Sequence, residues 1–176
     1  MKSWCKAVMI ALAAQWAAMG TAVAQAPDAA TRIGVYDSRA VAIAYAGSPH
    51  LRSRIEALKE QRAAALAAGD AAAAARLADE GAAIQRGLHA QGCGSAPVDD
   101  LLAHIAPQLP AVREHAGVGR LISKWDAAAL AAQPRAVRVD VTWALVEAFA
   151  PDERARRHAR EIIAVPPQRA STRRSP

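Results

Sequence analysis

The sequence predicts an α+β fold, mostly helical, in which about three strands form a small body and an antiparallel helical hairpin projects from it. Hydrophobic residues make up 53% of the chain but aromatic residues only 4%, and alanine, the best helix former, is abundant. Two alanine-rich amphipathic segments meet at Gly69-Asp70, which predicts the hairpin. Short alternating segments rich in β-branched residues predict the strands at 31–37, 120–125 and 137–141.

The first 24 residues have the pattern of an export signal. A basic start precedes an apolar run at residues 7–19 that is shorter than a membrane span, and residues 22–24 form a small-x-small cleavage motif. We therefore predict cleavage after Ala24 and localisation to the periplasm. The alternative is an uncleaved membrane anchor. Residues 25–31 are expected to be a flexible leader.

The positive charge of the chain lies at its C-terminal end. Cleavage would leave 20 basic residues against 16 acidic ones, a net charge of +4. Residues 151–176 contain seven arginines and three acidic residues, so residues 25–150 are neutral. A basic exported segment suits an anionic lipid surface or an acidic partner better than nucleic acid. A merely solvated, disordered end is the alternative.

The first elements of the body are a strand and a short helix. Residues 31–37 alternate and carry β-branched and aromatic side chains, which favours the strand. Asp37-Ser38 then supplies an N-cap for a helix at 40–46, and Gly47-Ser48-Pro49 ends it.

The hairpin consists of helices at 50–68 and 71–90, together the arm 50–90. Gly69 predicts a left-handed stop and Asp70 a new N-cap, so the two helices must pack antiparallel. Their apolar stripe, available for packing within the arm or for a client, is Leu51, Ile55, Leu58, Leu77, Ile84 and Leu88. A single low-complexity helix kinked at Gly69 is the alternative.

Short elements complete the body. Pro97 suits the first turn of a helix that buries Leu101, Leu102 and Ile105, and Gly117 closes a helix at about 110–116. Strands at 120–125 and 137–141 follow, separated by a connector. Alternation in the second of them places Val137, Val139 and Val141 on one face.

Two helices are expected after the last strand. Thr142 is predicted to cap the first, on which Trp143, Val146 and Phe149 share a face. The second, at 151–164, is basic and amphipathic, and residues 165–176 are expected to form a disordered basic tail. The basic residues assigned to this region are Arg154, Arg157, Arg160, Arg169, Arg173 and Arg174.

The order of these segments resembles the Skp/OmpH family of periplasmic chaperones. RIGVYDSRAVAIAYAGS at 32–48 is similar to the family's opening strand and following helix. The C-terminal part of the family's fold has a glycine that leads into a strand and a D-[IV]-T motif that opens the last helix. Residues 115–149 of this chain are similar to it, with the sequence HAGVGRLISKWDAAAL…VRVDVTWALVEAF. The family-motif positions are Asp37, Trp125, Asp140, Thr142 and Trp143, and the resemblance spans residues 32–150.

The resemblance implies a small β-rich body with a projecting, coiled-coil-like arm. In the family, three bodies join through their strands into a trimer, and the arms enclose unfolded outer-membrane proteins. We therefore expect a non-enzymatic protein that binds unfolded or envelope proteins. The arm is shorter than the family's and rich in alanine, which indicates a divergent, short-armed branch. The alternative is an envelope adaptor that places its basic C-terminal helix and tail on anionic lipid or an acidic partner.

A third hypothesis is a thiol- or metal-dependent enzyme. Cys93 with His89 and His104 would supply the ligands or nucleophile, and Asp99, Asp100 and His104 would supply an acid–base group. No CxxC, HExxH, GxGxxG, GxxxxGK[ST] or GxSxG motif accompanies them. We therefore predict no catalytic residue, metal or cofactor. Trp125 and Trp143 are assigned to the core or a subunit interface, with a ligand groove as the alternative.

Overall fold

The computed structural model describes residues 32–167. The expected signal peptide, the leader and Arg169, Arg173 and Arg174 of the tail lie outside this range. No helix within residues 32–167 is both long and apolar enough to cross a membrane. In chain order the elements are β1 (Arg32–Tyr36), α1 (Ser38–Ala46), α2 (Pro49–Ala67), α3 (Ala71–Gly92), α4 (Asp99–Leu102), the 3-10 helix η2 (Ala103–Ile105), α5 (Leu109–Ala116), β2 (Arg120–Ser123), α6 (Ala127–Ala131), β3 (Val137–Asp140), α7 (Thr142–Ala148) and α8 (Glu153–Ile163).

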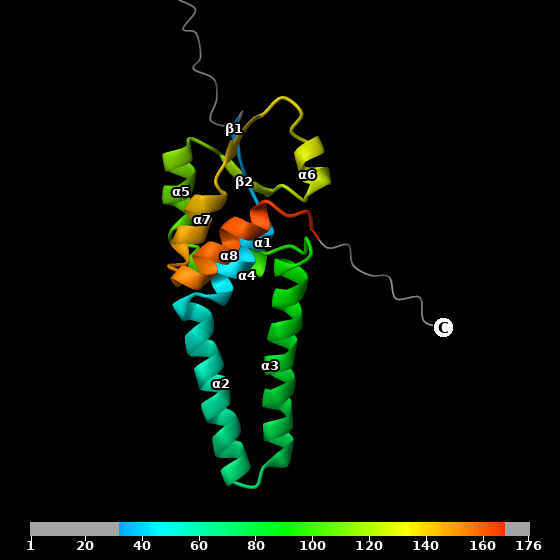
Figure 1. The fold of residues 1–176 in the computed structure, drawn as a ribbon, viewed down its shortest axis with the longest axis vertical. Coiled ribbons are helices and arrows are strands. Elements are labelled where there is room, and N and C mark those ends of the chain that lie inside the picture. Colours follow the sequence, from blue (N-terminus) through cyan, green and yellow to red (C-terminus); the bar gives the residue numbers. More distant parts are fainter. Residues whose placement is uncertain (1–31, 168–176) are drawn as a thin grey trace, which may run out of the picture.

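A three-stranded sheet lies at the far end of the body from the arm (Figure 1). Its order is β2-β1-β3, and β1 pairs in parallel with both neighbours. The predicted class, mostly helical with about three strands, is confirmed. The parallel direction is consistent with the crossovers, because α1 to α5 and η2 connect β1 to β2, and α6 connects β2 to β3.

The hydrophobic core lies between the sheet and the helices around α1. That helix buries most of its residues and contacts α3, α7 and α8. Leu145, Val146 and Phe149 of the α7 region are almost fully buried against it. Ala155 and Ala159 of α8 are buried as well, so α8 covers α1 with its small side chains.

Two long helices leave the body side by side, and the chain runs out along α2 and back along α3 (Figure 1). Ser48 caps α2 by accepting a hydrogen bond from the Leu51 amide, and Pro49 occupies the first turn. Gly69 adopts φ 73° at the turn. Asp70 caps α3 by accepting a 2.8 Å hydrogen bond from the Ala73 amide.

The prediction that Thr142 caps α7 was wrong. The helix begins at Thr142 itself, and the residue before it, Val141, makes no side-chain cap. The Thr142 hydroxyl instead accepts a 3.0 Å hydrogen bond from the Asp37 amide, and Asp140 Oδ1 accepts one of 2.8 Å from the Thr142 amide. A long-range partner therefore takes the hydroxyl that a local cap would have used.

Three other expectations need correction. Val137 is 59% exposed, although Val141 is buried, because β3 is an edge strand and Val137 pairs with Arg32 at the outer end of β1. The supposed connector after β2 contains α6, which Asp126 caps by accepting a 2.9 Å hydrogen bond from the Ala129 amide. The helix expected at Pro97 begins at Asp99.

Candidate functional site

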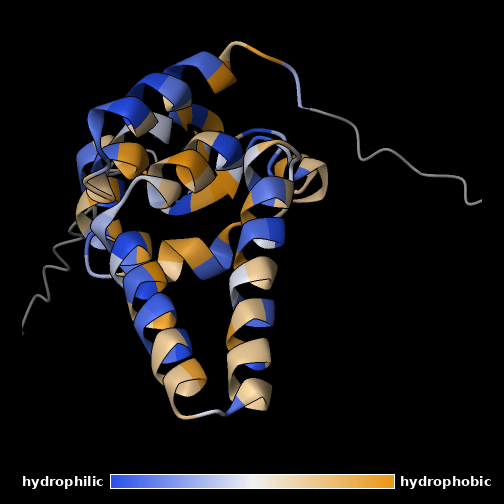
Figure 2. Cartoon of the chain, turned by 60° about the horizontal axis from the view of Figure 1, so that its bottom comes forward, coloured by the Kyte–Doolittle hydropathy of each residue, from blue (hydrophilic) through white to orange (hydrophobic). Residues whose placement is uncertain are grey.

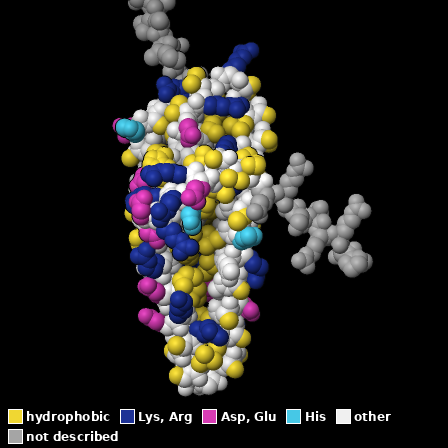
Figure 3. Space-filling view, viewed as in Figure 1, with side chains coloured by type: hydrophobic (Ala, Val, Ile, Leu, Met, Phe, Trp, Pro, Cys, Tyr) yellow, Lys and Arg dark blue, Asp and Glu magenta, His cyan; other side chains and the backbone are white. Residues whose placement is uncertain are grey.

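The paired helices α2 and α3 expose most of their surface. In α2 only Leu51 and Leu58 are buried, and in α3 only Ala74, Gln91 and Gly92. Figure 3 shows hydrophobic side chains gathered in a furrow between the two helices, with lysines and arginines on the α2 side. In Figure 2, α3 has mostly the intermediate colour of alanine, whereas α2 alternates with strongly hydrophilic residues. The arm thus presents a narrow apolar surface with a charged border.

The residues of the predicted stripe are largely shielded from solvent. Leu51 and Leu58 are 9% and 8% exposed, while the other four members are half-buried. Ile55, Ile84 and Leu88 pack against the core of the body, so the base of the arm is anchored. Leu66 near the tip, which the stripe omitted, is 55% exposed. The sequence signal that could have indicated Leu66 was a single leucine within a run of alanines.

Polar contacts between the arm helices are few. Arg54 Nη2 lies 3.2 Å from Glu80 Oε1, and both side chains are about half exposed. An exposed pair of this kind contributes at most about 1 kcal/mol. The arm is therefore held together chiefly by the apolar stripe and by close packing of alanines.

A buried polar network lies in the body, where β1 meets α1. Asp37 Oδ2 accepts a 2.9 Å hydrogen bond from Arg39 Nη2 and lies 2.6 Å from Lys124 Nζ. Asp37 Oδ1 accepts further bonds from Arg39 Nε at 3.1 Å and from Trp125 Nε1 at 3.1 Å. The Arg39 and Lys124 cations stand 4.8 Å and 4.7 Å from the Trp125 ring centroid. One carboxylate is therefore surrounded by donor groups of three residues, Arg39, Lys124 and Trp125.

The same network reaches the C-terminal helix. Arg39 has no exposed surface, and its guanidinium also donates to the carbonyl oxygens of Ile162 at 3.0 Å and Val165 at 2.7 Å. Ile162 belongs to the last turn of α8 and Val165 follows the helix, so Arg39 binds carbonyl oxygens at the C-terminal end of α8. Residue 165, where the disordered tail was expected to start, is thus fixed to the body by Arg39.

The donors around Asp37 determine its protonation. Burial alone would raise the pKa of this carboxyl, but hydrogen bonds from Arg39, Lys124 and Trp125 outweigh that effect and lower the pKa below its usual value. Asp37 is therefore an anion under ordinary conditions. Its charge compensates the two cations that the fold brings to it.

Four of the five family-motif residues converge here. Asp37 bonds both Trp125 and Thr142, and Asp140 bonds Thr142, whereas Trp143 lies apart beneath the Arg160 guanidinium at 4.7 Å. Sequence reasoning missed Arg39 and Lys124. The signal for Arg39 was a cation in the first turn of a helix, where the dipole disfavours it and a specific partner is needed.

The candidate thiol and acidic residues are dispersed. Cys93 Sγ lies 3.6 Å from His89 Nδ1, while the His104 ring stacks on Tyr45 at 4.8 Å. Asp100 accepts a 2.8 Å bond from Gln91, and Asp99 lines a separate pocket. Within residues 32–167 no three His, Cys, Asp or Glu side chains lie close enough together to hold a metal ion.

The basic surface of α8 is fixed by contacts with α7. Arg156 donates to both carboxylate oxygens of Glu147, at 3.0 to 3.2 Å. Arg154, Arg157 and Arg160 are exposed, and Ile163 and Val165 beside them are 38% and 51% exposed. Cations and aliphatic side chains therefore share this end of the body.

No family model, curated protein or solved structure matches this chain.

Proposed function

We propose that the protein is a non-enzymatic, chaperone-like binding protein of the Skp/OmpH type, exported to the periplasm. Its arm, an antiparallel hairpin of α2 and α3, would bind unfolded or outer-membrane proteins. The observation that supports this is the exposed apolar furrow along two helices that project from the body. Contiguous exposed apolar surface of this kind is typical of interaction sites.

The arrangement of the arm suits weak binding of many extended segments. Alanines offer a shallow surface without deep pockets, and the charged border on the α2 side keeps the arm soluble. The body supplies the rigid support, because α1 and the Asp37 network fix the helices from which the arm begins. The resemblance adds the expectation that three bodies join into a trimer.

The test is suppression of aggregation. The exported protein, residues 25–176, should reduce light scattering by an unfolded outer-membrane protein on dilution from denaturant. Leu66→Ser should weaken this protection several-fold, because Leu66 is the large hydrophobic side chain that α2 and α3 leave exposed. Ala67→Ser combined with Ala83→Ser, at exposed positions, is the matched control. Protection that is absent at excess protein, or equal in both variants, would contradict the proposal.

A second function, that of an envelope adaptor, is supported by α8. Its exposed arginines lie beside the exposed aliphatic residues Ile163 and Val165, a combination suited to an anionic lipid surface. Vesicles with anionic headgroups should bind the protein at low salt and release it as salt rises. Replacement of Arg154, Arg157 and Arg160 by glutamine should abolish the binding. Binding that is indifferent to salt and to this replacement would exclude the adaptor function.

A further inference from the structure

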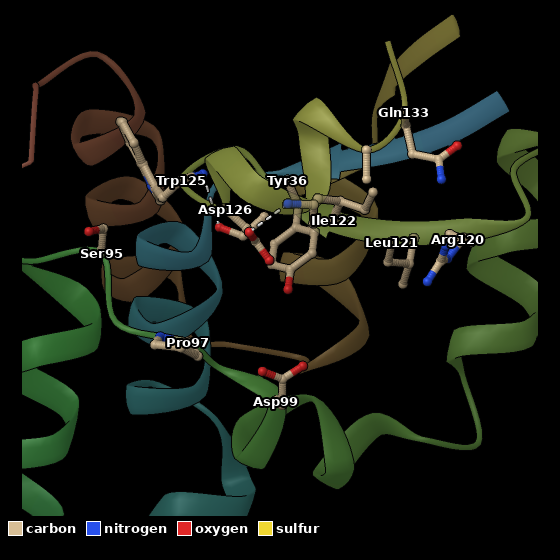
Figure 4. Close-up of a pocket in the computed structure, with 13 residues that line it drawn as sticks. Tyr36, Ser95, Pro97, Asp99, Arg120, Leu121, Ile122, Trp125, Asp126 and Gln133 are labelled. Atoms are coloured by element: carbon tan, nitrogen blue, oxygen red, sulfur yellow. Dashed lines mark hydrogen bonds between the residues drawn. The ribbon is translucent and has the colours of Figure 1, made fainter. Parts of the chain in front are cut away.

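A pocket of about 630 Å³ lies beside β2, at the carboxyl ends of β1 and β2 (Figure 4). Its walls come from three separate parts of the chain: the end of β1 with β2, the segment from Trp125 through α6, and the segment that enters α4. Its volume falls in the range of small-molecule sites, and the carboxyl ends of parallel strands are where such folds bind ligands. The pocket is separate from the furrow of the arm.

The Tyr36 hydroxyl is the polar group at the centre of this pocket. The residue is only 5% exposed and lines the pocket, and within residues 32–167 its hydroxyl makes no hydrogen bond. Figure 4 shows the hydroxyl directed toward the side where Asp99 lies, with Asp126 beside the ring. Within residues 32–167 the fully buried unpaired side-chain oxygen is that of Ser38, so the Tyr36 hydroxyl keeps access to the open pocket and offers it a free donor and acceptor.

Two carboxylates without a cationic partner flank this hydroxyl. Asp99 and Asp126 both line the pocket, and neither forms an ion pair with a Lys, Arg or His of residues 32–167. Arg120 is the cation that lines the pocket with them, whereas Arg39 and Lys124 are paired with Asp37 outside its lining. The two carboxylates raise the pKa of Tyr36, together with burial as the larger cause, to about 12. The charged groups that line the pocket are thus two carboxylates and one guanidinium, a net negative charge, and the carboxylates lie near a protonated hydroxyl.

We propose that this pocket binds a small organic amine, with its ammonium group held by Asp99, Asp126 and the Tyr36 hydroxyl. Charge-assisted hydrogen bonds to carboxylates are strong and suit an ammonium donor. The remaining wall is largely apolar, with Pro97, Leu121 and Ile122, which fits a short hydrocarbon chain. Arg120 at the rim disfavours a second cation there, so a monoamine should bind more tightly than a diamine.

Isothermal titration calorimetry of the purified protein tests this with three five-carbon probes: pentylamine, cadaverine and pentanoate. Pentylamine should bind best, cadaverine more weakly and pentanoate not at all. Asp99→Asn combined with Asp126→Asn should reduce pentylamine affinity on the order of tenfold or more. Asparagine at 126 still caps α6, so the wall of the pocket is preserved. Tyr36→Phe should reduce the affinity several-fold.

The matched control is Glu60→Gln combined with Asp79→Asn, which makes the same charge change on exposed arm positions. Its pentylamine affinity should equal that of the unmodified protein. Binding of pentanoate in preference to the amines would show that Arg120 dominates and would overturn the proposal. So would equal affinity in the pocket and control variants, absence of binding at millimolar amine, or calcium binding without amine binding.

Discussion

At the scale of single residues, Asp37 is the group on which the body depends most. Asp37→Asn would leave the fully buried Arg39 without its counter-charge, and breaking a buried pair on one side costs about 3–5 kcal/mol. Urea unfolding should show a loss of that size. Asp37→Asn with Arg39→Met should recover part of it. Arg54→Ala, which breaks an exposed pair, should cost under about 1 kcal/mol. A similar small loss for Asp37→Asn would contradict the role of the network.

The lowered pKa of Asp37 predicts acid sensitivity. Because the folded-state pKa lies below the unfolded value of about 3.9, the stability it contributes is fully present above that value. It is lost as pH falls through the lower, folded-state pKa. The stability difference between the unmodified protein and Asp37→Asn should therefore be constant near neutral pH and shrink below about pH 4. Unfolding free energies measured across this range check it, and a constant difference down to pH 2 would contradict it.

Tyr36 provides a second titration. The chain has two tyrosines, so its phenolate absorbance is simple to resolve. Burial, with Asp99 and Asp126 nearby, raises the pKa of Tyr36 to about 12, and Tyr36→Phe should remove the transition at that pH. Asp99→Asn with Asp126→Asn should move it toward the ordinary value, since two of its causes disappear. A transition unaffected by either variant would show that Tyr36 does not face these carboxylates.

The residue scale also shows what a sequence conceals. Asp37 was selected as a family-motif position, yet its partners Lys124 and Trp125 follow β2, almost ninety residues away. Tyr36 was recognised only as part of a strand. Its role at the pocket depends on Asp99 and Asp126, which parallel pairing and α6 bring to it. Such sites depend on which distant segments the fold brings together, and local sequence patterns carry no information about that.

At the scale of elements, local signals were sufficient at several helix ends, although the predicted Thr142 cap was wrong. Asp37 and Asp70 begin helices, and Gly117 ends one, as their residue types predicted. Strand positions followed from alternation, but strand direction did not, because period-two alternation is the same in parallel and antiparallel sheets. The α6 helix was missed because five residues of alanine and leucine carry no amphipathic pattern.

The contact between α1 and α8 gives a prediction for elements. A Cβ at Gly47 would lie 2.2 Å from the Ala155 Cβ, so Gly47→Ala must push α8 away from α1. Overpacking of this kind costs about 1–3 kcal/mol. Ala155→Gly in the same chain should restore much of the loss, which a double-mutant cycle would measure as strong coupling.

Gly87 is the matched control for that substitution. A Cβ there meets no atom within 4 Å, so Gly87→Ala in the exposed helix α3 should stabilise the protein by about 0.5–1 kcal/mol. Thermal or urea unfolding should show a lower free energy of unfolding for Gly47→Ala and a higher one for Gly87→Ala. If Gly47→Ala were as well tolerated as Gly87→Ala, α8 would not be packed tightly on α1.

At the scale of the whole molecule, the outer edge of β3 is a surface available for assembly. Within residues 32–167, β3 pairs only with β1, so its other edge is unpaired, and Val137 on it is 59% exposed. Unpaired edges of this kind are ready to pair with another chain. The expected trimer would cover this edge, and it would bring three arms together around one space.

Light scattering after gel filtration under reducing conditions should therefore give the mass of three chains for residues 25–176. Val137→Lys places a charge on the edge that would be covered, so it should shift the mass toward one chain. Val165→Lys, at a comparably exposed position on the C-terminal side, should leave the mass unchanged. A single-chain mass for the unmodified protein would mean that one arm acts alone. A shared cavity would then be excluded, and client binding would depend on the furrow of each separate arm.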